Sequence, residues 1–71
     1  MVFLSITDIT GRTYPYQVTE AGIKVEDVVV TPDNYCLDDI RSFMENYPSI
    51  TVENRIFRTE HIIEISVNNR E

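Results

Sequence analysis

A histidine, a cysteine and a group of carboxylates are the residues of this chain that could do chemistry. His61 is the only histidine and lies between Glu60 and Glu64, which suggests a general base oriented by a carboxylate. Successive side chains of a strand point to opposite faces, so both glutamates lie on the face opposite His61 unless residues 59–61 bend. We therefore expect His61 to be a partly buried residue that caps the edge of the core or forms a hydrogen bond with a turn.

The segment DNYCLDD, residues 33–39, could bind a metal ion or carry a reactive thiol. A calcium-binding loop needs oxygen ligands at its third and fifth positions, where this segment has Tyr35 and Leu37. Cys36 is the only cysteine, and no Cys–His motif surrounds it. We expect structural roles instead: carboxylates favoured near a helix N-terminus, and a small residue beside an apolar stripe. The sequence thus predicts no catalytic residue, no metal and no cofactor.

The small size of the chain limits what it can build. Its 71 residues, 42% hydrophobic and 25% charged, predict one globular domain spanning residues 1–71. One cysteine excludes an intrachain disulfide, and a structural zinc ion needs four Cys or His ligands. A core this small gives modest stability, so we expect self-association, with tight packing of the single molecule as the alternative. We expect no enzyme, because catalytic pockets of roughly 300–1,000 Å³ are difficult for so short a chain to enclose.

The charge distribution excludes two classes of partner. The formal net charge is −6, and residues 20–45 hold seven acidic residues against Lys24 and Arg41. Nucleic acid binding needs a basic surface, and an anionic membrane would repel this chain, so neither partner is expected. No run approaches 18 apolar residues, and the opening MVFLSI lacks the features of a signal peptide. Together with the single cysteine, these features predict a cytoplasmic protein.

The first third of the chain is predicted to form β-structure. Strand patterns cover residues 2–9 and 13–18, with a turn at Gly11 between them. Pro15 cannot donate a ladder hydrogen bond, which predicts an edge strand or a bulged one. Residues 24–31 are expected to form a further strand, although a short helical turn before the valines is left open.

Residues 33–47 form the clearest predicted element, an amphipathic helix. Asp33 and Asn34 are suitable N-caps, and Pro48 ends the helix because the residue before a proline is pushed out of the α region. The apolar residues recur at the helical period and form one stripe: Leu37, Ile40, Phe43, Met44 and Tyr47. One side of the helix should therefore pack on a sheet.

The second β region covers residues 49–69. Asn54 is expected to adopt the left-handed conformation in a tight turn, and residues 58–60 are expected to bend before the final strand. The chain is therefore predicted to be α+β: a small antiparallel sheet or curled barrel of about five strands, with one helix near residues 33–47.

The final strand should show whether the sheet has an open face. Ile63, Ile65 and Val67 share one parity and are expected to face the core, whereas Ile62 is expected to face the other side. An exposed Ile62 would mark that second face as an interface, and a buried Ile62 would remove this suggestion.

Other residues suited to protein contacts occur on three predicted elements. Tyr14 and Tyr16 share one face of their strand, and tyrosine is enriched at protein contacts. Arg55 and Arg58 form a basic turn that could meet the acidic helix of another subunit and set its orientation. The acids on that helix are Asp38, Asp39 and Glu45.

These features predict a small, non-catalytic protein-interaction or assembly module that associates with itself or with a partner protein. The alternative is an acidic inhibitor or regulator that occupies a basic, nucleic-acid-binding surface of a partner protein. The acidic middle third of the chain motivates this alternative.

Overall fold

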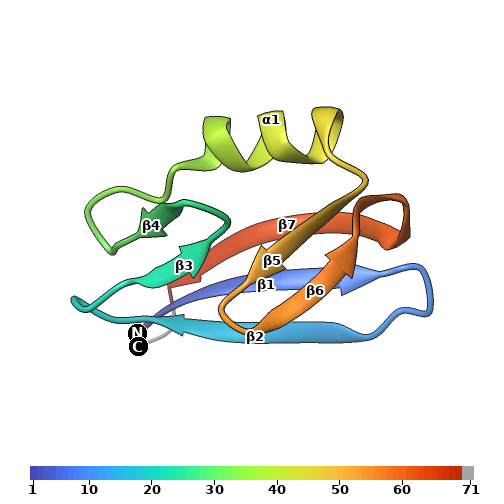
Figure 1. Ribbon diagram of the computed structural model, residues 1–71. Coiled ribbons are helices and arrows are strands. Elements are labelled where there is room, and N and C mark those ends of the chain that lie inside the picture. Colours follow the sequence, from blue (N-terminus) through green and yellow to red (C-terminus); the bar gives the residue numbers. More distant parts are fainter. Residues whose placement is uncertain (70–71) are drawn as a thin grey trace.

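The computed structural model describes residues 1–69 and confirms the α+β class (Figure 1). Strands, one helix and one short 3-10 turn follow one another along the chain. Their bounds are β1 Val2–Asp8, β2 Thr13–Val18, β3 Ile23–Val25, β4 Val28–Val30, α1 Leu37–Asn46, β5 Ser49–Val52, β6 Arg55–Arg58, η1 Thr59–His61 and β7 Ile62–Asn69. No helix in the described part of the chain is long and apolar enough to cross a membrane.

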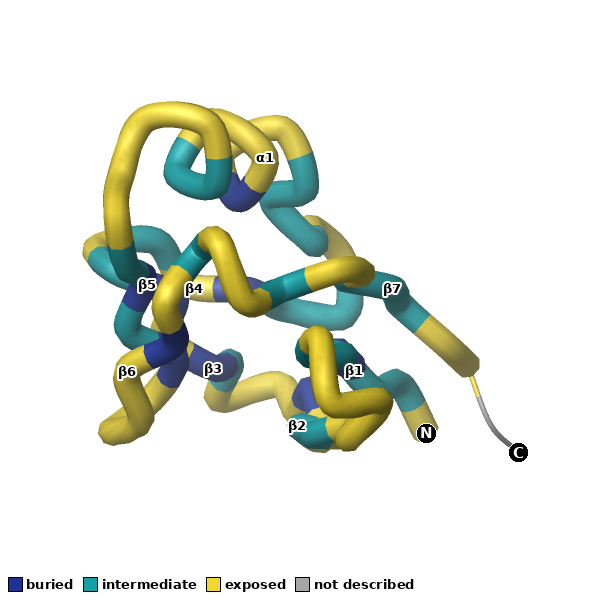
Figure 2. Tube along the Cα trace, turned by 90° about the vertical axis from the view of Figure 1, so that its right-hand side faces the viewer, coloured by how far each residue is buried: buried dark blue, intermediate teal, exposed yellow. Residues whose placement is uncertain are grey.

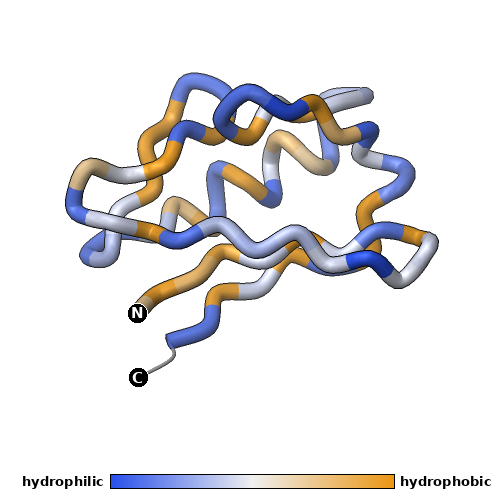
Figure 3. Tube along the Cα trace, turned by 90° about the horizontal axis from the view of Figure 1, so that it is seen from below, coloured by the Kyte–Doolittle hydropathy of each residue, from blue (hydrophilic) through white to orange (hydrophobic). Residues whose placement is uncertain are grey.

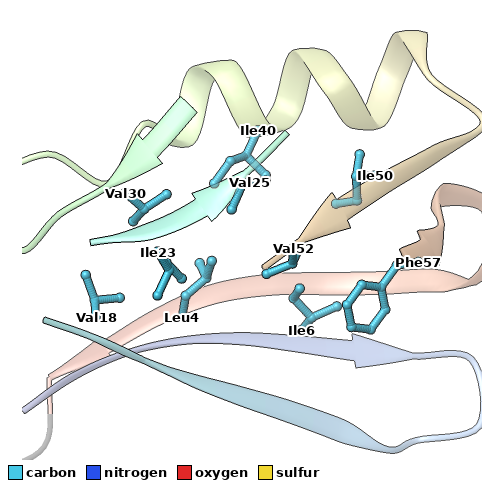
Figure 4. Packing of buried hydrophobic residues seen from close by; sticks show 10 residues of the cluster. All are labelled: Leu4, Ile6, Val18, Ile23, Val25, Val30, Ile40, Ile50, Val52 and Phe57. Carbon is cyan, nitrogen blue, oxygen red and sulfur yellow. The ribbon is translucent and has the colours of Figure 1, made fainter. Parts of the chain in front are cut away.

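The strands form two antiparallel sheets that enclose the core. One sheet has the order β2-β1-β7 and the other the order β4-β3-β5-β6. Helix α1 lies over one side of both sheets (Figure 2). Apolar side chains from the two sheets and the helix point into the space between them (Figure 4). The buried set is Leu4, Ile6, Val18, Ile23, Val25, Val30, Ile40, Ile50, Val52 and Phe57.

Alternation along the strands places these side chains inside, and Figure 3 shows hydrophobic and hydrophilic positions alternating along much of the chain. In the three-stranded sheet, Leu4 lies opposite Tyr16 and Val67, so all three face the core. Pro15 lies on the outer face of β2 opposite Ser5. β2 is an edge strand, as the position of Pro15 predicted. The missing N–H of Pro15 therefore removes no hydrogen bond from the interior of the sheet.

Residues 23–30, read from the sequence as one strand from residue 24, form the hairpin β3–β4 instead. Glu26 adopts the left-handed conformation (φ 54°) in the tight turn between the two strands. The carboxylate of Glu26 accepts a hydrogen bond of 2.9 Å from the backbone N–H of Thr51. This tertiary contact fixes a turn that lacks the usual Gly or Asn signal.

Helix α1 begins four residues later than predicted, at Leu37, and the prediction that Asp33 or Asn34 caps it is wrong. Cys36 is the N-cap residue, with φ 51° and no capping hydrogen bond from its side chain. The side chain of Asn34 instead accepts a hydrogen bond of 3.1 Å from the N–H of Cys36. Such local side-chain bonds offer the backbone an alternative to helix, which explains the delayed start.

The second β region differs from the prediction in two places. The first is the turn between β5 and β6. Glu53, with φ 55°, takes the left-handed conformation expected of Asn54. The N–H of Glu53 donates to the carbonyl oxygen of Lys24 at 2.7 Å. The position of the turn is therefore fixed by this contact with β3 and not by the tendency of Asn54 to adopt the left-handed conformation.

The second departure is a bulge in β7. Thr7 lies opposite Glu64 and Asp8 lies opposite Ile62, so Ile63 is an extra residue without a partner. The extra residue shifts the parity of the strand. Ile62 therefore packs against the core together with Ile65, whereas Ile63 is 63% exposed. The predicted faces of Ile62 and Ile63 are wrong for this reason.

Candidate functional site

An open groove of about 680 Å³ runs between helix α1 and strand β7. The helix side and its preceding loop contribute Tyr35, Leu37, Ile40, Arg41, Met44 and Glu45, and the strand side contributes Ile62, Ile63, Glu64, Ile65, Val67 and Asn69. A hollow of this size was not expected from the sequence, because a pocket is difficult for so short a chain to enclose. It arises because α1 covers the gap between the sheets and leaves space beside β7.

Each wall of the groove follows from a pattern in the sequence. Ile40 is 2% exposed and anchors the helix in the core, so that Leu37 and Met44 lie half-buried on either side of it. On β7, Ile65 and Val67 are also half-buried. The groove floor is therefore aliphatic, which is the usual character of a small-ligand or peptide site.

Strand β7 is also an open edge of its sheet. It pairs with β1 on one side only, as the order β2-β1-β7 shows. In an antiparallel pair, alternate residues direct their N–H and C=O groups away from the partner strand. A row of backbone donors and acceptors therefore lies next to the apolar groove.

Charged side chains surround the groove with a negative excess. Glu45 and Glu64 lie along it, and neither forms an ion pair with any of residues 1–69. Among the described residues of the lining, Arg41 is the one cation, and its guanidinium lies 3.8 Å from the carboxylate of Asp38 on the same helix. An apolar floor beside free carboxylates favours an apolar segment that carries positive charge.

Tyr14 and Tyr16 lie far from this groove in the sheet order, on the opposite edge strand β2. The ring of Tyr14 packs edge-on against Phe57, with centroids 5.2 Å apart. The guanidinium of Arg55, an exposed residue, lies 4.8 Å from the centroid of the Tyr14 ring. Burial raises the pKa of the Tyr16 hydroxyl above its ordinary value. Both tyrosines thus pack against the core, and Tyr14 contacts residues of β6.

The acidic and basic candidates are not brought together within one molecule. Asp38 and Asp39 are exposed in the first turn of α1. Arg58 is on β6, where its guanidinium lies 2.7 Å from the carboxylate of Glu60. The predicted meeting of this basic turn with the acidic helix concerns two subunits, so it stays a prediction that contacts within one molecule do not test.

His61 is not the partly buried residue that the sequence predicted. It lies in the 3-10 turn η1, its side chain is 48% exposed, and Nε2 is 3.9 Å from the Glu60 carboxylate. The bend removes the strand parity on which the prediction depended. Cys36 donates through Sγ to the carbonyl oxygen of Val29 at 3.6 Å. Among residues 1–69, no three His, Cys, Asp or Glu residues lie close enough together to hold a metal ion.

The groove was not predicted, because the helix stripe and the Ile63, Ile65 and Val67 face of the last strand were both assigned to the core. Of the groove residues, only Glu45 and Ile62 were among the interface candidates. The run of three isoleucines in IIEI, residues 62–65, was the available signal, since one strand face cannot bury all of them. No protein-family model, no curated protein and no solved structure matches this chain.

Proposed function

We propose that this protein is a non-catalytic protein-interaction module that binds an extended segment of another polypeptide between α1 and β7. The observation that carries the proposal is the apolar groove of about 680 Å³ alongside the open edge of β7. In strand addition, main-chain hydrogen bonds supply affinity, and pockets for alternate side chains supply specificity. The groove and the edge together offer both kinds of contact.

The lining of the groove supports binding over catalysis. Its described walls contain aliphatic side chains, one tyrosine, one asparagine and three charged residues, but no Ser, Thr, Cys or His. A nucleophile needs an adjacent base within hydrogen-bond reach. Cys36 and His61, the residues best suited to these roles, lie on different elements and have other contacts.

The second candidate function is an acidic inhibitor of a basic surface. The observation in its favour is the exposure of Asp38 and Asp39 at the start of α1, outside the groove lining. Charge reversal of both residues to Lys separates the two functions. It abolishes binding to a basic partner if the acids mimic a phosphate backbone, and it leaves occupancy of the groove intact.

A panel of synthetic extended peptides with alternating aliphatic residues tests the proposed function. We expect the best of them to shift backbone amide NMR signals of α1 and β7. Ile63→Glu places a charge in the groove and should abolish these shifts. Ile9→Glu is the matched control, because Ile9 is also exposed (59%) but lies outside the groove. The proposal is wrong if no peptide and no copy of the chain perturbs α1 and β7.

A further inference from the structure

We infer that the segment bound in the groove is strand β6 of a second copy of this chain, so that copies join head to tail. This inference rests on the proposed function and names the occupant of the same groove. It is carried by three properties of β6, which are an open edge, an exposed apolar side chain and flanking positive charge.

Strand β6 has an edge available for pairing. In the order β4-β3-β5-β6 it is the terminal strand, and its register with β5 pairs Ile50 with Phe57. Phe57 is buried, so strand alternation turns Ile56 to the outside, where it is 70% exposed. Ile56 is the most exposed large hydrophobic residue of the described chain. An aliphatic side chain on an open strand is what the groove beside β7 can accept.

The charges on β6 complement those of the groove. Arg55 and Arg58 are the first and last residues of β6, and both are exposed. Glu45 and Glu64 of the groove have no ion-pair partner within residues 1–69. Arg58 contacts Glu60, but an exposed pair of this kind contributes little and can exchange partners. A docked β6 therefore provides cations for carboxylates that the single molecule leaves unpaired.

A symmetric pairing of β7 with β7 of a second copy is less favourable. It would bring together two copies of the same surface, on which the described residues include Glu45 and Glu64 against Arg41, and like net charges in an interface oppose association. Contact of β6 with the groove uses two different surfaces, so it is heterologous. Repetition of such a contact gives a ring or an open chain of copies.

Two single variants test this arrangement because each blocks one side of the contact. Ile56→Glu removes the inserted side chain but keeps the groove, and Ile63→Glu blocks the groove but keeps β6. In light scattering, we expect the mass of the wild-type chain to rise with concentration. The dissociation constant for assembly of each variant alone should be at least about tenfold higher than that of the wild type.

An equimolar mixture of the two variants is the decisive sample. Ile63→Glu still donates its β6 and Ile56→Glu still accepts it, so the mixture should form dimers that grow no further. Ile9→Glu is the control with the same change in charge at an exposed isoleucine, and it should assemble as the wild type does. Urea unfolding of each variant establishes that it is folded. Raising the salt from about 50 to about 500 mM should weaken assembly of the wild type, because screening reduces the charge contribution.

Three results would overturn the inference. The first is a wild type that stays monomeric up to about 1 mM, which means that any dissociation constant for assembly is weaker than about 1 mM. The second is unchanged assembly of Ile56→Glu, and the third is a variant mixture without dimers. If the monomeric chain still binds an extended peptide in the groove, the proposed function stands and only the occupant is wrong. If neither peptides nor copies bind there, both proposals fail.

Discussion

Gly22 and Gly11 have nearly the same φ angle but very different surroundings. Their φ angles are 81° and 85°, a region in which residues with a Cβ are disfavoured. A Cβ at Gly11 would meet no atom within 4 Å. A Cβ at Gly22 would lie 2.5 Å from Cγ1 of Val29 and 3.0 Å from the carbonyl oxygen of Val30. Gly22 is thus required for close packing as well as for its turn.

We predict that Gly22→Ala destabilises the protein more than Gly11→Ala does. Gly11→Ala should cost about 1–2 kcal/mol from backbone conformation alone. Gly22→Ala should cost about 2–4 kcal/mol, because overpacking against β4 adds to the same backbone term. Urea unfolding of both variants measures the difference. Equal losses would show that β4 moves away from the new methyl group without cost.

Asp8 organises the turn that leads from β1 to β2. Its Oδ1 accepts hydrogen bonds from the N–H of Thr10 at 2.9 Å, from the Thr10 hydroxyl, and from the N–H of Arg12 at 3.1 Å. The Tyr14 hydroxyl donates to Oδ2 at 3.3 Å. The hydroxyl of Thr10 is the largest cause that lowers the pKa of Asp8 below its ordinary value of 3.8. The ionised carboxylate is therefore the form that holds the turn.

We predict that Thr10→Val raises the pKa of Asp8 and removes an acid-sensitive part of the stability. Since the pKa is lower in the folded than in the unfolded chain, this contribution is complete above the ordinary value of 3.8 and is lost as the pH falls through the folded value. The gap in unfolding free energy between wild type and variant should thus narrow from neutral to acidic pH. Carboxyl NMR titration and urea unfolding at several pH values measure both effects.

The control for this prediction is Thr13→Val. Thr13 shares a hydrogen bond of 3.1 Å with the hydroxyl of Thr7 and none with Asp8. Its loss of stability should not depend on pH in the acidic range. A pKa for Asp8 that stays the same in Thr10→Val would contradict the assignment of the hydroxyl as the main cause.

Strand β7 shows how one extra residue redirects an element. From Glu64 to Asn69 its register with β1 is regular, and simple alternation places Ile65 and Val67 on the core face, as the sequence predicts. The bulge at Ile63 then reverses the pattern and turns Ile62 inward. A bulge depends on how β1 turns at Asp8, so the alternation within β7 alone could not reveal it.

We predict that alanine substitutions at the two neighbouring isoleucines have unequal effects. Ile62→Ala should lower the free energy of unfolding by about 1–2.5 kcal/mol, because Ile62 is partly buried against the core. Ile63→Ala should change it by less than about 0.5 kcal/mol, because Ile63 is 63% exposed. Chemical denaturation at a concentration where the chain is monomeric makes the comparison. The reverse order would restore the uninterrupted alternation that the sequence suggested.

At the scale of the whole molecule, the first strand holds the three-stranded sheet together. β1 pairs with β2 next to it in the sequence and with β7 at the other end of the described chain (Figure 1). The four-stranded sheet similarly joins β3 to β5 across the helix. Both sheets therefore depend on pairings between residues far apart in the sequence.

This topology predicts slow folding for so small a domain. Chains dominated by non-local strand pairing fold in roughly milliseconds to seconds, because loop closure precedes the stabilising contacts. Stopped-flow refolding from urea should give a phase in this range at concentrations below those of assembly. Complete refolding within about a hundred microseconds would show that local structure, and not the β1–β7 pairing, limits the rate.

The sequence by itself determined the α+β class, the amphipathic stripe of α1, its end before Pro48 and the edge position of β2. These four features depend on local periodicity or on the chemistry of proline. Both are properties of the segment itself and do not depend on where the segment packs. The tertiary structure alone decided the turns at Glu26 and Glu53, the start of α1 and the inward turn of Ile62.

The groove is also a feature that only the tertiary structure decided. Its walls come from α1 and β7, which adjoin only because β7 returns to pair with β1 while the helix anchors on Ile40. Local periodicity marks each wall as apolar but contains no information about the space between them. That space depends on where two separate elements come to rest, which is a property of the packed molecule.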